Sequence, residues 1–213
     1  MESLKAEYEE QSVGSGSYRS VLLGQIIIIS LCVLVLIIFL STFRKDIYAD
    51  NQKLLFILFA IVLEALMVRI SVNSLAFNIY LLPFCILPII VRSFYDTRIA
   101  LFVHLITILI ISFMVPNPFE FIFIQVLGGI VTIFSIVNMH KRSQIFATAS
   151  FIFLIYSIAF ISFNIIQEGG IDSISGLDFA WFAISAALTL CSYPLMFIFE
   201  KIFGFISDVS ILE

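Results

Sequence analysis

Long apolar stretches constrain this chain more than any other feature of its sequence. Of its 213 residues, 62% are hydrophobic and only 12% are charged, and the mean hydropathy is +1.15. A soluble domain of this size cannot bury so much apolar surface, so lipid must be the solvent. A helix needs ~20 apolar residues to cross ~30 Å of hydrocarbon. Seven segments meet or approach this length, at residues 20–43, 54–72, 79–94, 98–115, 119–137, 145–166 and 179–203.

The sequence therefore predicts an all-α, polytopic membrane protein built as a bundle of seven transmembrane helices. The third segment is short and contains Pro83 and Pro88. Each proline removes a backbone donor and favours a kink. Pro194 predicts a further kink in the seventh segment, where we hypothesise that a bend helps to transmit motion.

Basic residues in the connections predict the orientation of the bundle, because short cytoplasmic loops retain Lys and Arg while translocated loops lack them. The second, fourth and sixth connections contain none. The first, third and fifth contain Arg44, Lys45 and Lys53, then Arg92 and Arg98, then Lys141 and Arg142, with Lys201 ending the last segment. An odd number of spans then places the N-terminus outside and the C-terminus in the cytoplasm. We expect both ends of the chain to be cut from a longer protein.

Glu64 is the deepest ionisable residue of the predicted spans, near the middle of the second. Such groups are expensive in a membrane and are candidate functional sites. Arg69 lies ~140° around the same helix and does not face Glu64, so it snorkels to the outer headgroups instead. Three partners for Glu64 stay open at this point: an interhelical hydrogen bond, a ligand in a water-filled cavity, or a proton.

Other candidate residues have a structural interpretation beside a functional one. For His104, a hydrogen bond to a carbonyl is favoured over a metal site, because no second ligand lies beside it at the right spacing. Gln125, with Gly128 and Gly129, is typical of close packing between membrane helices. Three cysteines are expected to be small buried hydrophobes: Cys32, Cys85 and Cys191.

Several function classes lack their required residues. No lysine for a retinal Schiff base lies between residues 179 and 199, and no phosphate-binding glycine loop or His-Asp doublet is present. We therefore predict no catalytic residue, no metal site and no nucleic-acid partner for this segment.

Three stretches together resemble the membrane portion of the bacterial seven-transmembrane HD phosphohydrolases, the PgpH-type family. They are residues 81–90 (LLPFCILPII), 127–146 (LGGIVTIFSIVNMHKRSQIF) and 193–213 (YPLMFIFEKIFGFISDVSILE). Within the last stretch, Pro194, Glu200, Phe203 and Gly204 are similar to the family's exit from the membrane. Residues 3–8 resemble the end of its extracellular region.

The resemblance implies a transmembrane sensor that transmits a signal to a cytoplasmic HD domain, which hydrolyses cyclic di-AMP with two metal ions held by His and Asp. It implies an extracellular remnant at residues 1–19, a membrane domain at 20–205 and a linker toward the HD domain at 206–213. The fragment itself would not catalyse or bind a cofactor. Its partners would be the lipid bilayer of the bacterial cytoplasmic membrane and its own flanking domains, with a homo-oligomer left open.

Two alternative functions remain. One is a small-molecule or lipid-binding or transport unit, whose pocket would be lined by Glu64, His104, Gln125 and Asn164. The other is a passive membrane anchor. Pro194 and Glu200 are the candidate coupling residues on the way to the cytoplasm.

Overall fold

The computed structural model is helical throughout the residues it describes, which are 15–73, 78–136, 143–170 and 174–204. Its longer helices are α2 (Ser15–Phe43), α4 (Asn51–Asn73), α6 (Thr97–Ser112), α7 (Pro118–Ser135) and α8 (Ser143–Glu168). The shorter elements are α3 (Lys45–Tyr48), η1 (Ile79–Leu81), α5 (Ile86–Phe94), α9 (Gly176–Leu188), η2 (Thr189–Cys191) and α10 (Ser192–Phe203). No strand occurs in these ranges, which confirms the predicted all-α class.

Five helical stretches of the described chain are long and apolar enough to cross a membrane. They are Arg19–Phe43, Asn51–Val72, Pro118–Ser135, Phe146–Gln167 and Gly176–Phe203. Two further apolar stretches, Ile79–Phe94 and Thr97–Ser112, are shorter and correspond to the third and fourth predicted spans. The chain is thus a multi-pass membrane protein, and the count of seven spans stays a prediction.

Breaks between helices occur beside Pro83 and Pro194, but the kink expected at Pro88 is not a break, since Pro88 lies in the first turn of α5. Leu82, which precedes Pro83, is extended (φ −70°, ψ 131°), because a residue before proline is pushed out of the helical region. In the seventh segment, the 3₁₀ turn η2 separates α9 from α10 one turn before Pro194. The predicted end of the fourth segment at residue 115 is wrong. There α6 stops at Ser112, since Pro116 disfavours helix in the residues before it.

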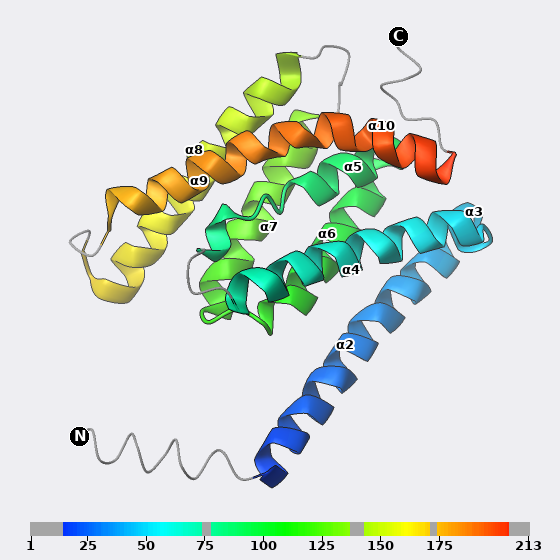
Figure 1. Ribbon diagram of the computed structural model, residues 1–213, viewed down its shortest axis with the longest axis horizontal. Coiled ribbons are helices and arrows are strands. Elements are labelled where there is room, and N and C mark those ends of the chain that lie inside the picture. Colours follow the sequence, from blue (N-terminus) through cyan, green and yellow to red (C-terminus); the bar gives the residue numbers. More distant parts are fainter. Residues whose placement is uncertain (1–14, 74–77, 137–142, 171–173, 205–213) are drawn as a thin grey trace.

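The connections gather at two opposite ends of the molecule. At one end, Arg44 of the first connection pairs with Asp96 of the third. At the other, Tyr80 in η1 donates a 2.7 Å hydrogen bond to Glu120 in the first turn of α7. The start of α2 and the end of α10 accordingly lie at opposite ends (Figure 1). The basic connections meet at the Arg44 end, as the sequence predicts for those within the described residues, and its assignment to the cytoplasm stays a prediction.

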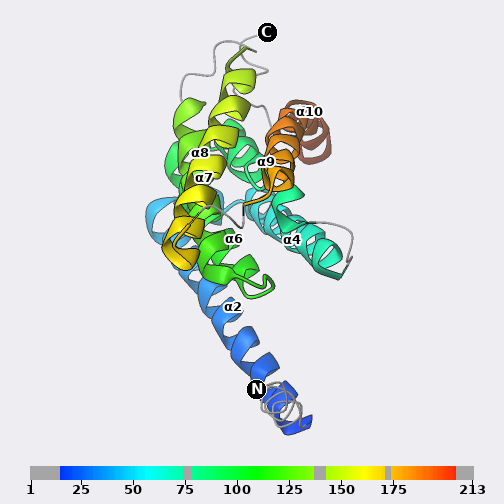
Figure 2. The same cartoon turned by 90° about the vertical axis from the view of Figure 1, so that its left-hand side faces the viewer.

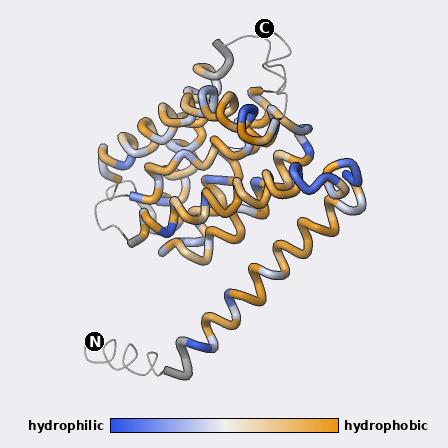
Figure 3. Tube along the Cα trace, turned by 45° about the vertical axis from the view of Figure 1, so that its right-hand side comes forward, coloured by the Kyte–Doolittle hydropathy of each residue, from blue (hydrophilic) through white to orange (hydrophobic). Residues whose placement is uncertain are grey.

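The two halves of α2 have different surroundings. In its C-terminal half Leu36 and Leu40 are fully buried, and Phe39 stacks on Phe102 of α6 with ring centroids 3.9 Å apart. The N-terminal half stands clear of the other helices (Figure 2), and Ile27 there is 65% exposed. Figure 3 shows hydrophobic residues along this helix and hydrophilic ones around α3. A helix apolar on all sides suits lipid as its solvent.

Candidate functional site

A chain of buried polar side chains connects α6, α7 and α8 with the segment just before α5. Tyr156 of α8 donates a 2.5 Å hydrogen bond to Oε1 of Gln125 on α7, and its hydroxyl lies 3.2 Å from Sγ of Cys85. Nε2 of His104 on α6 lies 3.0 Å from the backbone oxygen of Gln125. All four side chains are 0% exposed. Because a carbonyl oxygen only accepts, Nε2 carries the proton, and the predicted carbonyl partner of His104 is confirmed.

Two adjacent glycines on α7 allow this close approach. A Cβ atom on Gly128 would collide with the ring of Tyr156, and one on Gly129 would collide with the ring of His104. Small residues at such places let membrane helices pack backbone against side chain. The packing interpretation of these glycines is therefore confirmed.

The chain of polar groups is not fully satisfied. Nδ1 of His104 and Nε2 of Gln125 have no hydrogen-bond partner within the described residues. A buried polar atom without a partner costs about 1–3 kcal/mol. Within the same part of the chain no cluster of three or more His, Cys, Asp or Glu side chains is arranged to hold a metal ion.

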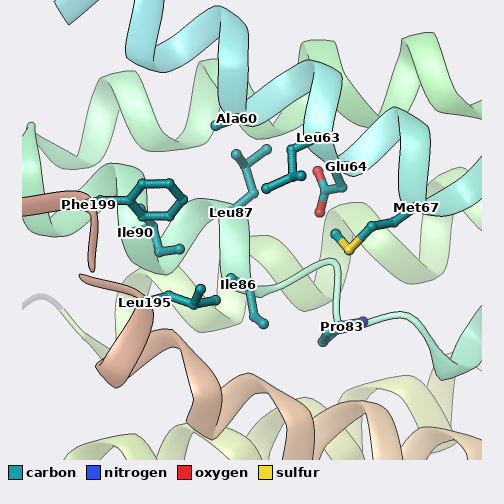
Figure 4. A pocket seen from close by; sticks show the side chains of 10 residues that line it. All are labelled: Ala60, Leu63, Glu64, Met67, Pro83, Ile86, Leu87, Ile90, Leu195 and Phe199. Carbon is teal, nitrogen blue, oxygen red and sulfur yellow. The ribbon is translucent and has the colours of Figure 1, made fainter. Parts of the chain in front are cut away.

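Glu64 makes no hydrogen bond to this network but lies near enough to interact electrostatically with Cys85 and Tyr156, and it lines a cavity bounded by α4, α5 and α10 (Figure 4). Its side chain is 5% exposed, and Oε2 has no hydrogen-bond partner among the described residues. The interhelical hydrogen bond considered from the sequence is therefore not observed for this atom. The cavity measures about 190 Å³, and its other walls are apolar: Ala60, Leu63, Met67, Pro83, Ile86, Leu87, Ile90, Leu195 and Phe199.

The predicted pocket that combined four polar residues is wrong. His104 and Gln125 belong to the buried network, and Asn164 donates a 3.0 Å hydrogen bond to the backbone oxygen of Phe160 on its own helix. Only Glu64 of the four lines the cavity. The cavity lies on the face of α4 that turns toward α5 and α10, whereas His104 and Gln125 meet between α6 and α7.

The two candidate coupling residues of the last segment both lie in α10, after the 3₁₀ turn η2. Pro194 is in the first turn of α10, and the backbone oxygen of Glu200 accepts a 2.8 Å bond from Gly204, whose φ of +70° ends the helix. Cys32 and Cys85 are buried as expected, but Cys191 is exposed, because it lies on the outer side of η2.

Two buried polar residues, one in the network and one on the helix face of Glu64, were not identified from the sequence. Tyr156 was not singled out, although it is the largest fully buried side chain. Ser71 was also missed, and it is 6% exposed with Oγ unpartnered among the described residues. Its spacing of seven residues from Glu64 places the two side chains on the same helix face, and this signal was available from the sequence.

An ion-pair cluster joins the first and third connections outside the apolar helices. Arg44 donates two hydrogen bonds to Asp46, each 3.0 Å long, and a further one to Asp96. These bonds hold the pKa of the Asp46 carboxyl below its usual value. Asp96 also caps α6 by accepting a 2.9 Å bond from the amide of Ile99.

The chain matches one protein family over most of its length. The family is described as a 7TM receptor with intracellular HD hydrolase, and the match covers residues 20–207. Neither the curated proteins nor the solved structures searched contain a match to the chain.

Proposed function

Because the chain belongs to the family of 7TM receptors with an intracellular HD hydrolase, we propose that it is the membrane-embedded sensor of such an enzyme and transmits a signal to it. The match over residues 20–207 carries this proposal. The hydrolase domain would follow the end of α10, and residues 206–213 would be the linker to it. Residues 1–19 would be the remnant of an extracellular region.

The finer parts of the proposal rest on the resemblance to the PgpH-type proteins and on the basic connections. The chain would cross the bacterial cytoplasmic membrane seven times, with its N-terminus outside. The attached domain would hydrolyse cyclic di-AMP with two metal ions of its own. The chemistry of that reaction would take place in the attached domain.

An aromatic cluster joins α4 to α10, the helix that would lead to the hydrolase domain. Phe56 of α4 is fully buried and meets Phe199 and Phe203 of α10, with ring centroids 5.4 Å and 5.1 Å away. In this proposal the 3₁₀ turn η2, which joins α9 to α10 within one helical stretch, is the point at which α10 bends relative to α9. A signal that binds two such arrangements with different affinity would change the orientation of the hydrolase.

The test is Phe56→Ala in the full-length enzyme in lipid nanodiscs. We expect the rate of cyclic di-AMP hydrolysis to change about fivefold or more, the lower range of allosteric couplings, with the metal content unchanged. Phe134→Ala is the matched control, since Phe134 of α7 is 67% exposed. Rates equal to wild type in both Phe56→Ala and Pro194→Ala would instead establish a passive anchor.

A further inference from the structure

Two polar side chains of α4 are buried on one face without partners. Glu64 is 5% exposed and Ser71 is 6% exposed, and neither Glu64 Oε2 nor Ser71 Oγ has a hydrogen-bond partner among the described residues. Seven residues separate them, so they share a helix face and lie roughly 10 Å apart along the axis. Buried polar groups are normally satisfied, so two such groups on one face, both unpartnered within the described residues, indicate a place where a ligand can bind.

Each of these side chains faces a cavity, and the two cavities share Met67 as a wall. The cavity at Glu64 measures about 190 Å³ and the one at Ser71 about 260 Å³. The second is lined by Met67, Ile70, Ser71, Leu81 and Leu82. A dry apolar cavity of about 150 Å³ binds benzene. The cavity at Glu64 therefore has room for one ring or a short alkyl chain, and the pair of cavities has room for a longer molecule.

The residues that line these two cavities favour a cation with an apolar body. A buried carboxyl group and an amine form an ammonium–carboxylate pair when one proton moves to the amine, and each buried charge then has the other as its partner. None of the ion pairs of the described residues includes Glu64.

We propose that the groove along α4, formed by these two cavities, binds an apolar amine whose ammonium group donates to Glu64. A hydroxyl group at the far end of the molecule would reach Ser71. Glu64 lies near the middle of α4, roughly 20 Å along the axis from Asn51 and roughly 14 Å from Asn73, so the headgroup amine of a lipid at either interface lies more than two helical turns away. The occupant is a free amine dissolved in the hydrocarbon.

A molecule bound in the groove would contact α10, the helix that leads toward the proposed hydrolase domain. Leu195 and Phe199 of α10 line the same cavity as Glu64, so a bound amine contacts α4 and α10 together. This consequence for hydrolysis rests on the proposed sensor function, whereas binding itself does not.

The test uses the full-length protein in phosphatidylcholine nanodiscs, with labelled hexylamine as the probe in equilibrium dialysis. We expect saturable binding that Glu64→Gln weakens about tenfold or more, because a charge-assisted bond is lost. Hexanoate, which has the same chain and the opposite charge, should not bind. Glu120→Gln is the matched control, since Glu120 is 8% exposed, is bonded to Tyr80 and does not line the groove.

A second probe tests the length of the groove. We expect 6-amino-1-hexanol to lose affinity severalfold in Ser71→Ala while hexylamine does not, because only the amino alcohol reaches Ser71. Ser162→Ala on α8 should leave both probes unaffected, since that exposed hydroxyl bonds the backbone of Ile158 on its own helix.

Equal hexylamine binding in wild type and Glu64→Gln, or equally tight binding of hexanoate, would overturn the amine site. Hydrolysis measured in the same samples separates the two proposals. Specific amine binding that leaves hydrolysis unchanged supports the site and contradicts the sensor function. A Phe56→Ala effect on hydrolysis without amine binding does the reverse.

Discussion

At the scale of residues, the hydrogen-bond partner of His104 could be predicted from the sequence, whereas the surroundings of Glu64 could not. The sequence favoured a carbonyl partner for His104 because no other metal ligand lies near it, and that partner is the backbone of Gln125. Glu64 was identified by its depth in an apolar segment. Its unpartnered Oε2 could not be predicted, because that depends on which side chains the neighbouring helices α5 and α10 present to it.

The contact between His104 and α7 yields a prediction for Gly129→Ala. The new Cβ would collide with an imidazole ring that is fully buried and cannot move aside. We expect a loss of about 1–3 kcal/mol in stability, the usual cost of overpacking, seen as a lower thermal unfolding midpoint in detergent. Gly24→Ala on α2 is the control, because nothing lies within 4 Å of the new atom. An equal midpoint for both variants would contradict the close approach of α6 and α7.

At the scale of elements, proline residues predicted where helices break, and capping residues explain where helices begin. The breaks before Pro83 and Pro194 follow from the missing amide and the crowding of the preceding residue. The start of α9 lies at Gly176, three residues before the predicted one, because Ser175 and Asp178 form a capping box. The capping box is visible in the sequence, but the predicted start at residue 179 was based on the apolar residues alone.

Asp96 caps α6 and also pairs with Arg44, and two substitutions separate these roles. Asp96→Ala removes both, and we expect a loss of about 0.5–2 kcal/mol for the cap alone. Asp96→Asn keeps a good capping residue and removes only the charge of a half-exposed ion pair, so its loss should stay within about 1 kcal/mol. Thermal unfolding of the three proteins measures the difference. Equal losses in Asp96→Asn and Asp96→Ala would show that the ion pair, not the cap, dominates.

At the scale of the whole molecule, contacts between distant connections show how the helices are ordered. Arg44 meets Asp96 at one end, and Tyr80 meets Glu120 at the other. Phe203 at the end of α10 packs on Phe56 near the start of α4, with ring centroids 5.1 Å apart. The end of α10 therefore lies beside the first connection.

This arrangement predicts the sides of the two termini. Ser3→Cys in intact cells should react with a membrane-impermeant thiol reagent, and Glu213→Cys should react only after the cells are opened, because basic connections are retained inside. The unmodified protein, whose cysteines all lie in apolar segments, is the control for background labelling. Labelling of both positions from the same side would refute the predicted threading.

The sequence alone determined that this chain belongs in lipid, which segments are helical and where proline interrupts them. These properties are local, because apolar runs, caps and missing amides act within one or two helical turns. Only the tertiary structure decided that Glu64 faces α5 and α10 while His104 and Gln125 meet between α6 and α7, and that Glu64 and Ser71 line cavities without a partner among the described residues. That outcome depends on how the short helices η1 and α5 dock between longer ones, and docking is set by the shapes of side chains distant in the sequence.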